Sequence, residues 1–325
     1  MKRIALIVVL LMPILAYGQV DSTYIGFYDK DLGIRGFVAK DFVNMAQEIK
    51  GQDDKVFLPN NPVSVGAGLL IYNSVINFGY GYGFDFMRDK KKGKTKSFDF
   101  QYHYYGRKFV FDIALQRYKG FYLDNNDSDK ITIHPDMSIR MYGVHGLYVL
   151  NNKKFSYRAT FSQSERQLKS AGSFVVGGGI YNTKIASDTS FVYDGKNVLR
   201  NFQFGVSGGY AYNWVLGRYW FISGSTTVGI NFGSEKFSTF GKEKIKVTPS
   251  VYPRISVGYN RSEWALGFTY TSNIIFESLN DEDSISLYSG SFQLSYTKRF
   301  NLGKNQDKLD RLKRSKLLKI LDPGL

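Results

Sequence analysis

The sequence predicts an all-β protein: a transmembrane, antiparallel, up-and-down β-barrel that follows an N-terminal export signal. Three observations favour this class. Many segments alternate apolar and polar residues with period 2, and in one sense throughout. Aromatic residues make up 16% of the chain, with 24 Tyr and 26 Phe, as aromatic girdles at two membrane interfaces would need. Beyond the N-terminus, no stretch has the roughly 18 apolar residues of a spanning helix.

The clearest alternation is in the last predicted strand, residues 291–300. Phe292, Leu294, Tyr296 and Phe300 fall on one face, and polar side chains occupy the other. A strand of a soluble sandwich would give the same local pattern. Its repetition along most of the chain favours a barrel with lipid outside and a polar lumen inside.

Composition and charge narrow the class further. The formal net charge is +15, and the chain has 33 Gly, 7 Pro and no Cys. The basic residues cluster in a predicted loop at 90–96 and in the C-terminal tail, where they would be solvated near anionic lipid head groups. We therefore expect no nucleic-acid partner. The missing cysteine excludes a lipoprotein, whose lipid is attached to an N-terminal Cys.

The first 18 residues have the three parts of a secretory signal peptide. Lys2 and Arg3 are the basic region, 4–15 is a short apolar run, and small residues at 16 and 18 suit cleavage before Gln19. A retained membrane anchor is the alternative. After export, the chain could span only the outer membrane, and only as a closed barrel.

The predicted barrel occupies residues 62–300 and has about 12 strands, within a range of roughly 10 to 14. Residues 19–61 form an N-terminal segment whose stretch 34–49 alternates imperfectly, so it is either a first strand or a periplasmic segment. Short links at 215–218 and 260–263 alternate with long ones at 233–246 and 277–286. Because bacterial barrels have short periplasmic turns, the last strand would end in the periplasm. The predicted strands are 63–71, 76–86, 98–104, 109–115, 137–150, 155–161, 174–181, 202–214, 220–232, 251–259, 264–270 and 291–300.

The basic tail, residues 301–325, has only weak helical spacing. It is either a periplasmic contact for peptidoglycan or an acidic partner, or a solvated tail.

Several segments together resemble a family of exported proteins from Gram-negative bacteria known as domain of unknown function 4421. The resemblance lies in YIGFYDKDLGIRGF at 24–37, LPNNPVSVGAGLLIYN at 58–73, FDFQYHYYGRKFVFDIALQRYKGFYL at 98–123 and FSYRATFSQSERQLKSAGSF at 155–174. It implies an outer-membrane β-barrel, and it implies no activity or site residues.

No catalytic constellation stands out. His145 and Ser138 have an odd spacing that puts them on opposite strand faces, whereas His103 shares a face with Asp99. The third histidine, His134, has no evident partner. Gly177 to Gly179 lack the following Lys-Ser/Thr of a phosphate loop, and no metal-ligand spacing is present. We predict no catalytic, cofactor or metal site and no enzyme activity.

The predicted function is therefore an integral outer-membrane barrel with a pore, transport or structural role and unknown cargo. Its partners would be outer-membrane lipids and, during biogenesis, the barrel-assembly machinery. Four charged residues are lumen candidates that would set selectivity or form a salt-bridged plug: Asp112, Arg140, Arg254 and Glu263. One alternative is a lipid-modifying hydrolase, which needs a Ser–His pair at one rim. The other is a secreted, soluble β-sandwich binding protein.

Overall fold

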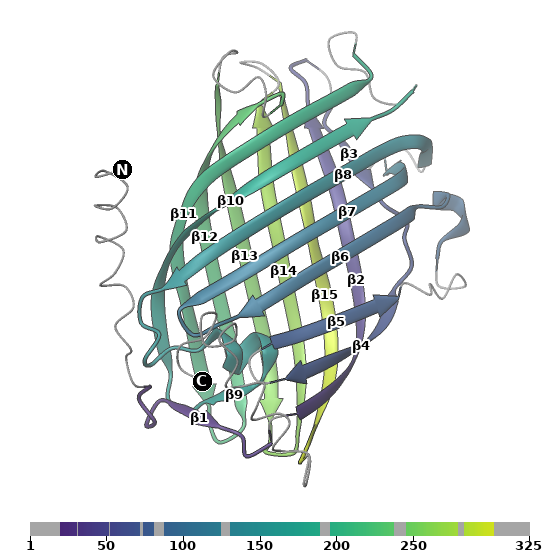
Figure 1. The fold of residues 1–325 in the computed structure, drawn as a ribbon. Coiled ribbons are helices and arrows are strands. Elements are labelled where there is room, and N and C mark those ends of the chain that lie inside the picture. The colour runs from purple at the N-terminus through teal and green to yellow at the C-terminus, as the bar shows by residue number, and fades with distance from the viewer. Residues whose placement is uncertain are drawn as a thin grey trace, which may run out of the picture.

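A computed structural model describes residues 20–30, 32–51, 53–71, 74–80, 88–124, 131–188, 196–236, 245–278 and 283–301. Nearly all regular structure in these residues is β-strand (Figure 1). Two short helical turns are η3 (Lys90–Lys92) and η4 (Arg158–Ser162). The strands are β1 (Ile25–Phe27), β2 (Leu32–Glu48), β3 (Lys55–Leu58), β4 (Ser64–Ile71), β5 (Ser74–Tyr80), β6 (Lys96–Tyr105), β7 (Phe109–Asp124), β8 (Ile131–Val149), β9 (Glu165–Gln167), β10 (Ala171–Ala186), β11 (Val198–Leu216), β12 (Trp220–Ser234), β13 (Lys246–Asn260), β14 (Trp264–Ser278) and β15 (Ser284–Phe300).

The barrel closes where its first long strand meets its last. β2 and β15 pair antiparallel along their whole length, from Leu32 opposite Phe300 to Glu48 opposite Ser284. The stretch 34–49, whose role the sequence left open, is therefore a barrel strand. The barrel begins at Leu32, and the sequence-based start at residue 62 is wrong. Phe300 is its last residue, as predicted.

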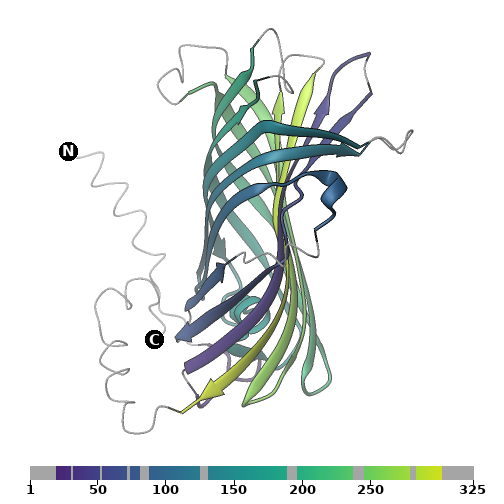
Figure 2. The ribbon, with the colours of Figure 1, turned by 90° about the vertical axis from the view of Figure 1, so that its right-hand side faces the viewer.

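The other edge of β2 is shared between two strands. β4 pairs with its first half, residues 32–39, and β3 pairs with Met45 to Gln47. The ring then continues to β7 either directly through β3 or through β4, β5 and β6 (Figure 2). Counted through β3 the ring has 10 strands, and counted through β4 to β6 it has 12. Both counts confirm the predicted range.

The two faces of the strands follow the predicted sense in the second half of the chain. On β12, Ser223 and Thr227 point inward and are buried, whereas Ile222, Val228 and Ile230 are exposed on the outside. Along this part of the ring, the outer surface is thus apolar and the inner surface polar. This arrangement contradicts the sandwich alternative, in which two sheets would bury apolar faces against each other.

The ends of the barrel differ. The links at 217–219 and 261–263 are short and lie at one end, which we call the short-turn end. All three tryptophans lie there: Trp214 is two residues before the end of β11, Trp220 begins β12 and Trp264 begins β14. The Tyr259 ring lies 5.0 Å from that of Trp220 and 5.3 Å from that of Trp264. Such an aromatic group marks a membrane interface. Among the described residues, no helix is long and apolar enough to cross a bilayer.

Candidate functional site: a lumen filled by the chain itself

The segment between β8 and β10 folds back into the lumen at the short-turn end. It contains η4 and β9, and we call residues 151–170 the plug. The predicted strand 155–161 is therefore wrong, since its core is a single π-helical turn. Short apolar runs do not distinguish a strand from a buried turn. The three aromatic residues of that run pack inside the barrel against Tyr105, Leu147 and Val175.

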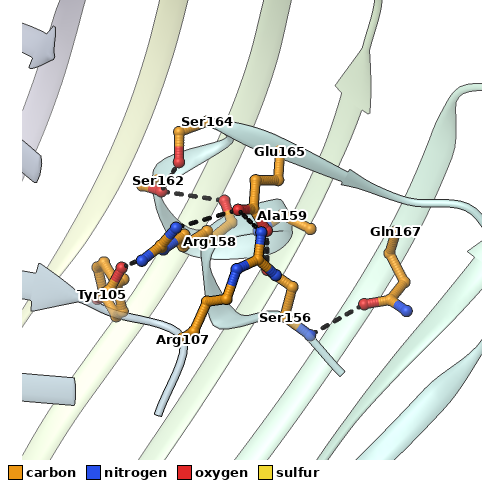
Figure 3. A network of polar contacts seen from close by, with 9 residues as sticks. All are labelled: Tyr105, Arg107, Ser156, Arg158, Ala159, Ser162, Ser164, Glu165 and Gln167. Carbon is orange, nitrogen blue, oxygen red and sulfur yellow. Dashed lines mark hydrogen bonds and ion pairs between the residues drawn. The ribbon is translucent and has the colours of Figure 1, made fainter. Parts of the chain in front are cut away.

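A buried ion-pair network holds the plug in shape (Figure 3). The Glu165 carboxylate accepts hydrogen bonds from Arg107 Nη2 at 2.8 Å and from Arg158 Nη1 at 3.1 Å. Its second oxygen accepts a bond from Ser156 Oγ at 2.8 Å. Arg158 also donates to the carbonyl of Tyr105, on β6, at 2.8 Å. Charges this deeply buried are tolerated because each one is paired.

Side chains from distant parts of the wall bind the plug backbone. Ser256 Oγ donates to the carbonyl of Thr160 at 2.9 Å, and Asn260 Nδ2 donates to that of Ala159 at 3.1 Å. Arg35 on β2 donates to Ser162 O, and Arg299 on β15 donates to Gln163 O. Contacts from β13, β2 and β15 thus fix the plug to several strands at once.

The N-terminal strand forms a two-stranded sheet with the plug. β1 pairs with β9, with Ile25 opposite Gln167 and Phe27 opposite Glu165. Just after β1, the Tyr28 ring lies 3.6 Å from the Arg299 guanidinium. Burial raises the pKa of the Tyr28 hydroxyl to about 12. The segment before the barrel is therefore attached to the plug and to the end of β15.

Two of the four predicted lumen residues, Asp112 and Arg254, point into the lumen and form an ion pair. Arg254 Nη1 lies 3.4 Å from Asp112 Oδ1, and its Nη2 is closer to Oδ2. His103 Nδ1 lies 2.6 Å from the same carboxylate. His103 and Asp99 lie on the same face of β6, as predicted, and both line one cavity. The Asp99 carboxylate accepts hydrogen bonds from Gln101, Gln116 and Tyr118.

The other two lumen candidates lie elsewhere. Arg140 is exposed on the outer face of β8, and Glu263 is in an exposed turn. Glu263 pairs with Lys30 at 2.9 Å and Lys298 at 3.5 Å. Arg140 faces outward because its neighbours Ile139 and Met141 point into the lumen, where they are buried.

The far end of the lumen is apolar, which the sequence did not predict. Side chains from six strands form one buried hydrophobic cluster there. It lies inside the ring at the end away from the plug, so the interior is filled there as well. The members are Val43, Met45, Phe57, Tyr118, Phe121, Leu123, Met137, Ile139, Ile185, Ile285 and Leu287.

One Ser–His pair is present, though not at a rim. His145 Nε2 lies 3.0 Å from Ser207 Oγ, between β8 and β11 inside the lumen. His145 Nδ1 is 4.0 Å from Asp112 Oδ2, too far for an orienting hydrogen bond. The imidazole is 4% exposed and stacks on Tyr252 at 4.3 Å. Ser138 bonds to the carbonyl of Ala186, far from His145, and His134 packs edge-on against Phe57.

A polar cavity of about 610 Å³ remains inside the wall, between β2, β6, β14 and β15. Asp41 and Asp99 line it together with His103 and Arg35. Within the described part of the chain, no group of three His, Cys, Asp or Glu residues is arranged to hold a metal ion.

The sequence matches the family described as domain of unknown function (DUF4421) over residues 19–300. The chain belongs to this family. The match covers both the barrel and the strand that precedes it, and it confirms the resemblance inferred from the four quoted segments. No curated protein matches the chain.

Solved structures that match are outer-membrane proteins with very low identity. The outer membrane protease OmpT from Escherichia coli is 6% identical with a TM-score of 0.38, over 84% of this chain and 98% of that one. OmpT of Vibrio cholerae is 8% identical with a TM-score of 0.28, over 85% and 100% of the two chains. Ail of Yersinia pestis is 12% identical with a TM-score of 0.18, over 82% and 99%. TM-scores and identities this low give no information about activity or cargo.

Proposed function

We propose that this integral outer-membrane barrel does not act as an open diffusion pore. Its lumen is closed by its own chain, and any passage requires the plug to move. The apolar outer face and the tryptophans at the short-turn end support a position in the membrane. The short turns themselves support an orientation with that end toward the periplasm. A structural role, without passage of any cargo, fits the same closed lumen.

The observation that carries the proposal is the buried network at Glu165. Both Glu165 and Arg158 are 2% exposed, and the plug aromatics next to them lie in the core of the short-turn end. Moving the plug would separate Glu165 from Arg107, break the hydrogen bonds from β2, β13 and β15 to the plug backbone, and expose those aromatic rings. The lost hydrogen bonds and the exposed apolar surface favour the closed arrangement at rest.

Planar-bilayer recordings of the full-length, refolded protein test the closed lumen. We expect no steady conductance from inserted barrels, because the plug and the apolar cluster both obstruct the lumen. Heat-modifiable gel mobility would verify that the sample is folded. A steady open-channel current from the folded wild-type protein would overturn the proposal.

A thiol-labelling variant tests the plug itself. Thr160 is 1% exposed within the plug, and the chain has no Cys, so Thr160→Cys gives one reporter. We expect slow maleimide labelling in this background. Adding Glu165→Ala, which removes the carboxylate that pairs with Arg107 and Arg158, should speed labelling at least about tenfold, since the plug loses about 3–5 kcal/mol of pairing. Glu263→Ala, which removes an exposed carboxylate at the same end, is the matched control and should change nothing.

One observation favours a second function, hydrolysis by the Ser207–His145 pair. Against it, Asp112 is engaged by Arg254 and His103, so the imidazole lacks its orienting carboxylate. The pair also lies in the lumen and not at a rim that lipid could reach. The absence of enzyme activity stays a prediction.

A further inference from the structure

The cavity between β2 and β6 contains two carboxylates that the proposed function leaves unexplained. Asp41 comes from β2 and Asp99 from β6, and both line the cavity. Asp99 accepts hydrogen bonds from Gln101 Nε2 at 3.0 Å, Gln116 Nε2 at 2.8 Å and Tyr118 Oη at 2.7 Å. Ser64 Oγ donates to Asp41 at 3.4 Å. These donors are all neutral.

The cationic groups near the cavity are engaged elsewhere. His103 pairs with Asp112 at 2.6 Å, and Arg35 binds Ser162 O and Thr297 Oγ1. Lys40 points to the other side of β2 and donates to the carbonyl of Asn61. Within the parts of the chain that the structure covers, no Lys or Arg nitrogen lies within 4.0 Å of either carboxylate.

The two acidic groups therefore line one cavity, and within the described residues neither makes an ion pair with a Lys or Arg side chain. Both carboxylates are half-buried. Charges interact more strongly in a partly buried site than in open water, so this cavity favours a positively charged occupant. Protonation of one carboxylate would neutralise it but would not fill the cavity.

The rest of the lining suits an organic cation. Phe37, Tyr105 and Phe161 are buried around the cavity, and Phe98 and Phe100 lie beside Asp99 on β6. Aromatic faces attract ammonium groups, and carboxylates pair with them. A volume of about 610 Å³ lies within the range of small-molecule pockets. We propose that this cavity binds a small organic cation, an amine that carries an apolar group.

Three nearly isosteric probes test the proposal on the folded, full-length protein in detergent. They are the cation phenethylammonium, the neutral phenethyl alcohol and the anion phenylacetate, followed by saturation-transfer NMR or calorimetry. We expect the cation to bind at least tenfold more tightly than either isostere. A cation that binds no better than the alcohol overturns the proposal.

Variants locate the binding. Asp41→Asn with Asp99→Asn should weaken phenethylammonium binding at least tenfold, and Asp21→Asn, outside the ring and bonded to Thr23, should leave it unchanged. If the double variant fails to fold, each single variant should still show a severalfold loss of phenethylammonium affinity. Phe100→Ala, which removes an aromatic ring from the cavity lining, is a third variant in which binding should weaken. Unchanged binding in the folded variants contradicts the assignment. None of these results bears on whether the lumen conducts, so the closed-lumen proposal stands or falls separately.

Discussion

At the residue scale, the central charge pair shows how burial decides the effect of a substitution. Arg254 is 3% exposed, and its guanidinium pairs with Asp112. Replacing Arg254 with Met would leave the Asp112 carboxylate with only His103 as a partner. We expect a loss of about 3–5 kcal/mol in the free energy of unfolding, measured by urea titration in lipid vesicles.

The matched control is Lys298→Met, which removes one partner of the exposed Glu263. Exposed ion pairs contribute little, so this variant should unfold close to the wild type. Adding Asp112→Leu to Arg254→Met should recover part of the loss, because no unpaired charge then remains. Equal, small effects at Arg254 and Lys298 would show that the central pair is not buried as described.

The sequence could identify Asp112 and Arg254 because each is a charged residue on the polar side of a regular strand. It misplaced Arg140 because the lumen around Met137, Ile139 and Met141 is apolar, which reverses the usual sense of the pattern. The Arg158–Glu165 pair was missed because Arg158 lay in the predicted strand 155–161 and Glu165 in the polar link that follows it. Their contact depends on how the plug folds back, which no local pattern encodes.

At the scale of the element, the alternation in β14 makes a direct prediction. Phe268 is 41% exposed on the outer face, and its neighbour Thr269 lines the inner cavity. Phe268→Arg should cost about 2–4 kcal/mol in lipid vesicles, as a charge at the midplane of the lipid face does. Thr269→Arg should cost much less. Equal costs at the two positions would refute the assignment of faces.

Strands β11 to β15 were predictable because each has a polar lumen face along most of its length. β2 was harder for a physical reason: its inward side chains mix polar and apolar residues, so that Arg35 and Gln47 are buried on the same face as Val43 and Met45. Its outward face carries Lys40 and Asn44. Neither face is uniformly polar or apolar, and the alternation in the sequence is therefore irregular.

At the scale of the whole molecule, the barrel is one closed ring with its interior filled at both ends. The predicted signal peptide, residues 1–18, and the predicted tail after Asn301 lie outside the described residues. Cleavage before Gln19, a periplasmic tail and recognition of the last strand by the assembly machinery stay predictions. N-terminal sequencing of exported protein decides the first of these.

The closed ring depends on the antiparallel pairing of β2 with β15. Val38 and Leu294 are partners across that seam, and both side chains are exposed on the outer face. The chain has no Cys, so Val38→Cys with Leu294→Cys introduces one possible disulfide. Val38→Cys with Ile230→Cys, which places the second thiol on β12, is the control.

The measurement is electrophoresis of the oxidised, folded double variant after heating, with and without reductant. We expect the Val38→Cys and Leu294→Cys thiols to form a disulfide, giving a covalent loop that migrates faster than the reduced chain. The control pair should give no such band. If folded protein formed no Val38–Leu294 crosslink, or formed the control crosslink equally well, the first and last strands would not be neighbours and the closed ring would be contradicted.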